Sequence, residues 1–163
     1  MLTPYHILPD YAKVWVYQAS RSFTQEEVRE ISDILENFVD RWQSHGKDIN
    51  GCGSIYYRRF IVLVADDSNC KIGGCSIYET AKLLQEIEQA YSIELFDRLK
   101  VNYKITTDLV GSFPFNQLNE YIESGKINED TIVFNNLVDN KKDFETKWEI
   151  PLKESAYFKF VTV

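Results

Sequence analysis

The chain has 163 residues, of which 44% are hydrophobic and 26% charged, a composition typical of a folded domain and unlike that of a disordered one. Its formal net charge of −7 repels a phosphate backbone, so we expect no nucleic-acid partner. No run approaches the ~18 apolar residues of a membrane span, and residues 1–10 lack the pattern of a signal peptide. We therefore expect one cytoplasmic domain over residues 1–163, with its cysteines as free thiols.

The first predicted elements are a strand and an amphipathic helix. Residues 14–18 combine β-branched and aromatic side chains, which favours a strand. Thr24 and Glu27 form the capping-box pattern that begins a helix. Apolar residues then recur at helical spacing as far as Trp42. Gly46, which adopts the left-handed conformation readily, is the predicted end of this helix.

The middle of the chain has strand character over residues 53–65, and residues 60–65 are apolar throughout, as in a strand covered on both faces. Residues 57–59 form either a tight turn between two strands or a bulge within one. Ser76 and Glu79 repeat the capping-box spacing, so they predict the start of a second helix.

The last third of the chain predicts shorter elements. We expect a strand at 101–105, a helix at 112–124, a short strand at 131–134, a short helix at 140–148 and a closing strand at 156–163.

The order of these elements indicates the fold class. Strand, helix, two strands, helix and strand over residues 12–105 match the ferredoxin-like split βαββαβ pattern. With the added helix and the C-terminal strands, we predict a single-domain α+β fold. If residues 53–65 are one strand and not a hairpin, the alternative is a three-layer α/β sheet.

The loop at residues 66–76 is the predicted site, because loops on a rigid scaffold commonly carry function. Asp66 and Asp67 end a strand, where carboxylates could bind a cation or exchange a proton; the alternative is two solvated turn residues. A Gly-Gly pair lets the backbone approach a ligand closely. The predicted ligand-binding residues are Asp67, Gly73, Gly74 and Ser76.

Cys75 precedes the predicted helix start at Ser76, where the positive end of the helix dipole lowers a thiol pKa. It is either a nucleophilic or redox-active thiol or a small buried side chain. His45 and Asp66 are the candidate proton acceptors for it, although His45 at a helix end could equally bond the last carbonyls. The candidate catalytic residues are thus Cys75, His45 and Asp66.

Metal and cofactor signatures are incomplete. The chain has three cysteines and two histidines, scattered along its length. Cys70 and Cys75 have C-x4-C spacing, which departs from the paired knuckles of structural zinc sites, so we expect no metal; a disulfide between these two cysteines is the alternative. The glycines of the loop fit neither of the phosphate-binding loop patterns, and we expect no cofactor.

Several segments together carry a family resemblance. They are Pro9-Asp10 followed by Val14-Trp15-Val16-Tyr17-Gln18, Trp42 to Gly46, Gly74-Cys75-Ser76-Ile77, Leu95-Phe96-Asp97-Arg98, Val133-Phe134-Asn135-Asn136-Leu137-Val138, and Trp148 with Pro151. In these the chain resembles, over almost its whole length, a family of small bacterial proteins often labelled "ABC transporter ATPase". The sequence has no Walker A loop, so ATP hydrolysis is not an expectation that we carry over.

Two functional hypotheses follow. The first is a cytoplasmic module that binds a small molecule or a partner protein at residues 66–76, without catalysis. The second is a small thiol-dependent enzyme or redox sensor that uses Cys75. Both leave the ligand and the oligomeric state open.

Overall fold

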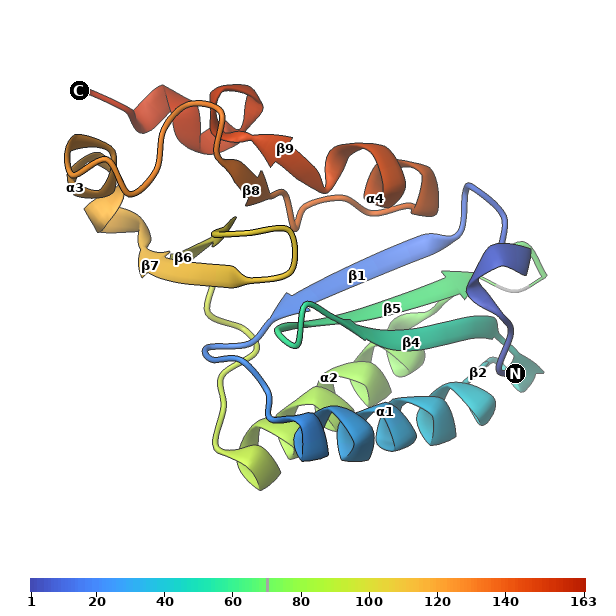
Figure 1. Ribbon diagram of the computed structural model, residues 1–163. Helices are drawn as coiled ribbons and strands as arrows, with labels where there is room; N and C mark the ends of the chain where they lie inside the picture. Colours follow the sequence, from blue (N-terminus) through green and yellow to red (C-terminus); the bar gives the residue numbers. More distant parts are fainter. Residues whose placement is uncertain (70) are drawn as a thin grey trace.

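A three-stranded antiparallel sheet lies at the centre of the molecule, in the order β1-β5-β4 (Figure 1). The structure is a computed structural model that describes residues 1–69 and 71–163, without the side chain of Cys75. The strands are β1 (Lys13–Gln18), β4 (Asn50–Tyr56) and β5 (Phe60–Asp66). The middle strand β5 is buried from Phe60 to Ala65, as its unbroken apolar sequence predicts.

Two helices, α1 (Gln25–Asp40) and α2 (Gly74–Tyr91), cover one face of this sheet (Figure 1). The predicted capping box begins α1: the Thr24 hydroxyl accepts the amide of Glu27, and the Glu27 carboxylate accepts that of Thr24. The helix buries Ile31, Leu35 and Val39, and these pack in one core cluster with residues of β5.

The end of α1 differs from the prediction. The helix stops at Asp40, and a small hairpin follows, made of β2 (Gln43–Ser44) and β3 (Lys47–Asp48). His45 and Gly46 form its turn with φ values of 54° and 77°, as the type I′ turn, a common two-residue hairpin turn, requires positive φ at both positions. Trp42 lies beyond the helix, yet its ring is buried against Phe38, which explains the apparent helical spacing.

The segment at 57–59 is a turn, so β4 and β5 form the hairpin that was one of the two sequence interpretations. Tyr57 and Arg58 both have a φ of 53°, and Arg59 N–H donates to Tyr56 O at 3.0 Å. These two positions lack the usual Gly or Asn. The Tyr57 ring packs against Phe134, and the Arg58 Nε donates to a backbone carbonyl, so side-chain contacts hold the strained turn.

A second antiparallel sheet lies against the other face of the first one, in the order β7-β6-β8-β9 (Figure 1). Its strands are β6 (Lys100–Lys104), β7 (Val110–Pro114), β8 (Ile132–Phe134) and β9 (Glu149–Pro151). The two layers meet in an aromatic cluster in which Phe60 of the first sheet contacts Phe134 and Trp148, with ring centroids 4.6 and 5.1 Å away.

The α+β class is confirmed. The order β1-β5-β4 is that of the first three strands of the split pattern, but β6 pairs with β7 and β8 in the second sheet and not with β1. The complete ferredoxin-like sheet predicted from the sequence is therefore not formed by the described strands.

The remaining elements are short. They are α3 (Leu118–Glu123), α4 (Lys141–Lys147) and the 3₁₀ turns η1 (Tyr5–Ile7), η2 (Phe115–Gln117), η3 (Leu152–Glu154) and η4 (Ala156–Phe160). The predicted helix at 112–124 is wrong in its first half, because residues up to Pro114 pair with β6. The predicted closing strand is wrong as well: the Ser155 hydroxyl accepts the amide of Tyr157 and begins a 3₁₀ turn. In residues 1–69 and 71–163, no helix is long and apolar enough to cross a membrane.

Candidate functional site

The predicted site lies where β5 ends. The Asp66 carboxylate accepts the amide of Ser68 at 2.9 Å, so it stabilises the first turn of the loop. Asp67 beside it is half-buried. Among the residues that the structure describes, no three His, Cys, Asp or Glu side chains converge in a way that could hold a metal ion.

The start of α2 differs from the predicted one. Gly73, and not Ser76, is the residue that precedes the helix, and its N–H donates to Ser44 Oγ at 3.2 Å. Ser76 is 1% exposed and its hydroxyl donates to Gln43 O at 2.8 Å. This hydroxyl therefore joins α2 to β2, and the Ser76–Glu79 spacing is not a capping box. Gly74 is exposed and has open space around it.

His45 lies beside this helix start. A Cβ atom on Gly73 would lie 3.0 Å from His45 Nε2, so the ring lies close to the start of the helix and glycine lets it do so without a shift. The hairpin of β2 and β3 has thus brought one predicted catalytic residue next to the 66–76 loop. The other partner of that prediction, the Cys75 side chain, lies outside the described part of the structure, and so does Cys70.

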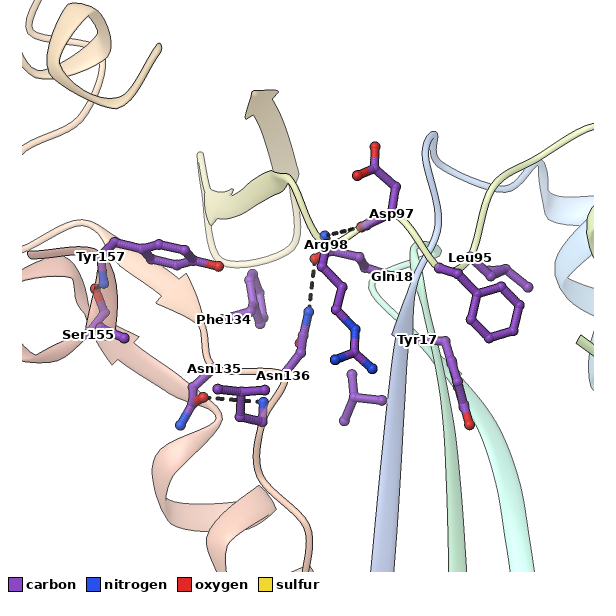
Figure 2. Close-up of a pocket in the computed structure, with 14 residues that line it drawn as sticks. Tyr17, Gln18, Leu95, Asp97, Arg98, Phe134, Asn135, Asn136, Ser155 and Tyr157 are labelled. Carbon is purple, nitrogen blue, oxygen red and sulfur yellow. Dashed lines mark hydrogen bonds between the residues drawn. The ribbon is translucent and has the colours of Figure 1, made fainter. Parts of the chain in front are cut away.

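A cavity of about 280 Å³ lies at the opposite end of β1, between the two sheets (Figure 2). In the strand register Gln18 is opposite Phe60, whereas Lys13 is opposite Ala65. Strands rise about 3.4 Å per residue, which separates the cavity from the 66–76 loop by about 20 Å. Four segments line it: residues 16–18, 95–98, 134–137 and 155–157.

Hydrogen bonds among the side-chain amides of Gln18, Asn102 and Asn136 fix the floor of this cavity, and we call this set of side chains the amide lattice. The Gln18 amide donates to the carbonyls of Asp97 (3.1 Å) and Lys100 (2.9 Å). Its oxygen accepts the amides of Asn102 and Asn136, the second at 2.8 Å. Gln18 thereby satisfies all of its donors and acceptors. One side chain therefore connects β1, the 95–100 segment, β6 and the segment that follows β8.

The aromatic cluster is joined to the amide lattice by a hydrogen bond from Trp148. Trp148 is 3% exposed, and its indole Nε1–H donates to Asn136 Oδ1 at 2.9 Å. The Asn136 side chain is thus fixed from two sides, by Trp148 and by Gln18. Hydrogen bonds on more than one side of Gln18 and Asn136 favour one position for each side chain, which gives the cavity a defined polar floor.

Arg98 supplies the positive charge of the cavity. Figure 2 shows its guanidinium directed into the cavity beside Asn136, while the carboxylate of Asp97 points the other way. The Asp97 carboxylate accepts the amide of Leu99 at 2.8 Å. In the described part of the chain, neither a hydrogen bond nor an ion pair engages the Arg98 guanidinium. Burial raises the pKa of Tyr17, and the nearby charge of Arg98 partly offsets that rise.

The wall opposite Arg98 comes from the C-terminal segment. The Tyr157 side chain extends across the cavity with its hydroxyl toward the centre (Figure 2), and burial raises its pKa. The Ser155 hydroxyl is already used, since it donates to Leu152 O at 2.7 Å. The apolar walls consist of Val16, Leu95, Phe96, Phe134 and Leu137.

A second hollow of about 250 Å³ follows the outer edge of β1 and shares five lining residues with the cavity. At its far end Val14 N–H donates to Asp139 O at 3.0 Å, away from β5. Alternate residues of a strand direct their backbone groups to the same side, so the N–H and C=O of Val16 also face this hollow.

The cavity was not predicted from the sequence. Gln18 and Asn102 were assigned to strands without a role, although a polar amide on a buried strand needs a hydrogen-bond partner, which is a usable signal. Three segments singled out in the sequence, residues 14–18, 95–98 and 133–138, contribute to the lining.

Comparisons of the chain with family models, with curated proteins and with solved structures found no match, so the functional argument depends on the geometry of the chain itself.

Proposed function

We propose that the protein is a binding module for a small organic molecule, and that the molecule occupies the cavity between the two sheets. One observation carries this proposal: a cavity of about 280 Å³ has a hydrogen-bonded amide floor, and a guanidinium that no described residue engages is directed into it. Its volume is close to the lower end of the ligand-pocket range, about 300–1,000 Å³, which suits a small ligand.

The chemistry of the lining favours binding over catalysis. The described lining holds neither histidine nor cysteine, and the Ser155 hydroxyl donates to a backbone carbonyl. A nucleophile needs an adjacent base or a lowered pKa, and the lining supplies neither to Ser155. Preorganised polar groups around an apolar space are typical of a site that recognises a ligand.

A screen of small metabolites tests the proposal. We expect at least one compound to raise the melting temperature and to shift the Trp148 indole N–H signal, which reports on the floor of the cavity. Ala156→Phe places a ring among the lining residues and should abolish both responses. Ala90→Phe, on the exposed surface of α2, is the matched control and should change neither. Equal responses in the two variants, or no response to any compound, would overturn the proposal.

The second candidate is thiol chemistry at Cys75, supported by the position of the His45 ring beside Gly73, two residues before this cysteine. Alkylation across pH 5 to 9, followed site by site, tests it. A reactive Cys75 should have an apparent pKa below the ~8.5 of a free thiol, and His45→Gln should raise that value. Cys52 is the internal control, since burial raises its pKa to about 11. A Cys75 that reacts only after unfolding would remove this candidate.

A further inference from the structure

We propose that the ligand of this cavity is a small monocarboxylate with an aromatic or branched aliphatic group, and that its carboxylate pairs with Arg98. This inference rests on the proposed function, which it makes specific. It follows from three properties of the cavity: the hydrogen-bonding groups left over by the lattice, the balance of charge, and the distribution of apolar surface.

The side chains of the cavity lining that the lattice leaves over can all donate a hydrogen bond, apart from the Asp97 carboxylate, which points away from the cavity (Figure 2). The oxygens of Gln18 and Asn136 are engaged by other amides and by Trp148, and the Asn135 oxygen accepts the amide of Leu137 at 3.3 Å. The lining groups without such a partner among the described residues include the guanidinium of Arg98, the Asn135 amide nitrogen and the hydroxyls of Tyr17 and Tyr157. A site with unused donors selects a ligand rich in acceptors.

The charge balance indicates a monoanion. Arg98 is the only cation among the lining residues of the cavity, and these residues are all described. The carboxylate of Asp97 points away from it (Figure 2), and Lys13 and Asp139 lie at the far end of the adjoining hollow. One guanidinium matches one carboxylate with two parallel hydrogen bonds. A phosphate dianion would leave a second charge that the lining does not balance.

The apolar surface gives the orientation of the ligand. Arg98 is exposed, so the carboxylate lies near the mouth of the cavity. Leu95 and Phe134 are 3% and 2% exposed and lie deeper, and they are the walls that an apolar group would contact. Phe96, which is 44% exposed and packs edge-on against Tyr17 at 5.8 Å, forms part of the rim. The ligand therefore enters with its apolar group first.

Matched pairs of probes test this inference. The probes are phenylacetate and 4-methylpentanoate, their primary amides, which have nearly the same shape without the charge, and phenyl phosphate. Affinities are measured by titration, with the side-chain amide signals of Gln18 and Asn136 as reporters of the cavity. We expect each acid to bind at least about tenfold more tightly than its amide.

Arg98→Gln should remove this preference, so that acid and amide bind equally. Arg29→Gln carries the same change of charge on the exposed side of α1 and should preserve the preference. Because Arg98 is exposed and makes no described hydrogen bond, its replacement should leave the fold intact.

The outcomes separate the inference from the proposed function. If an amide binds the wild-type protein as tightly as the corresponding acid, the ligand is not recognised by a carboxylate, but the cavity remains a binding site. Phenyl phosphate binding more tightly than phenylacetate would overturn the carboxylate inference as well. If no probe shifts the cavity signals but a neutral compound from the metabolite screen does, the carboxylate inference fails and the proposed binding function stands. If the screen also gives no response, both fail.

Discussion

The two faces of the central sheet are built in different ways. On one face, α1 and α2 cover Ile61 and Leu63 with apolar side chains. On the other face, the second sheet and α4 surround Phe60 with aromatic rings, and charged groups are buried nearby. Arg59 is 8% exposed and donates to the carbonyl of Val110 at 3.3 Å, and Lys141 is 6% exposed and donates to that of Leu8 at 2.7 Å.

This difference explains where the cavity lies. Apolar contacts between helices and a sheet tolerate small rearrangements, because they have no fixed direction. Buried polar groups need partners at defined distances and angles, so they fix the surrounding segments in one arrangement. The hydrogen bonds of Arg59 and Lys141 therefore favour one arrangement of the second face, and we expect a cavity bounded by it to keep its shape.

The largest expected effect comes from Trp148→Ala in the aromatic cluster. The change should cost about 3–5 kcal/mol of unfolding free energy, because a large buried ring leaves a cavity behind. It also removes the donor to Asn136, so ligand binding should be lost in the fraction that remains folded. Urea unfolding at low temperature measures the first effect, and titration with phenylacetate the second.

Leu35→Ala on the helix-covered face is the matched comparison for Trp148→Ala. Leu35 is fully buried, and its truncation should cost about 2–5 kcal/mol. We expect the affinity of the folded protein for its ligand to stay within about twofold of the wild type, since additivity holds for separate sites. Loss of binding in this variant would mean that the two faces are not independent.

Gln18→Leu isolates the amide lattice. The substitution nearly preserves side-chain volume but leaves the amides of Asn102 and Asn136 and the carbonyls of Asp97 and Lys100 without this partner. We expect a loss of about 2–3 kcal/mol, of the order found when buried groups lose their hydrogen bonds.

Gln85→Leu, on the exposed surface of α2, controls for the loss of a surface amide and should change stability by less than about 0.5 kcal/mol. The side-chain amide signals of Asn102 and Asn136 should move only in Gln18→Leu. A Gln18 variant as stable as this control would show that the lattice is not what fixes the second face.

The helix-covered face was also the predictable one. The Thr24–Glu27 capping box and the helical spacing of Ile31 and Leu35 are local patterns, and α1 begins where they indicate. The apolar run of β5 likewise predicted a strand covered on both faces. Each of these signals lies within one element, so a single stretch of sequence contains it.

The other face depends on contacts between distant parts of the chain. Gln18 and Asn136 are 118 residues apart, and no local pattern pairs them. The second sheet contains strands as short as the three residues of β8, too few for a period to be recognised. At the predicted site, Ser76 had the spacing of a cap, but the helix already begins at Gly74, so Ser76 lies inside its first turn and its hydroxyl donates to Gln43 O.

Glu27→Gln tests the helix-covered face by pH. Arg21 Nη1 and Nη2 donate to the two Glu27 oxygens at 2.8 and 2.9 Å, and this pairing lowers the pKa of Glu27 to about 2. A lowered pKa stabilises the fold above the unfolded value of 4.5, and that stability is lost as the pH falls from 4.5 towards 2. Since Arg21 is partly exposed, we expect a difference of only about 1 kcal/mol at pH 7.

The difference between Glu27→Gln and the wild type should shrink below pH 4.5 and disappear only below about pH 2, as measured by urea unfolding at each pH. Glu36→Gln, an exposed position on the same helix, should show no such trend. A difference that stays constant with pH would mean that the ionised Glu27 carboxylate does not carry the effect, since both the Arg21 pair and the Thr24 amide bond to its charged form.

His45→Asn has the smallest expected effect and separates the two candidate sites. His45 has a φ of 54°, and asparagine accepts this left-handed conformation more readily, so Asn-Gly should stabilise the turn by about 0.5 kcal/mol. Gly46→Ala, at a φ of 77°, should act in the opposite direction.

The turn lies at the 66–76 end of the sheet, about 20 Å from the cavity by strand rise, so the affinity for phenylacetate should not change. The rate of Cys75 alkylation should change in His45→Asn only if the imidazole serves that thiol, and a changed phenylacetate affinity would connect the two ends of the sheet.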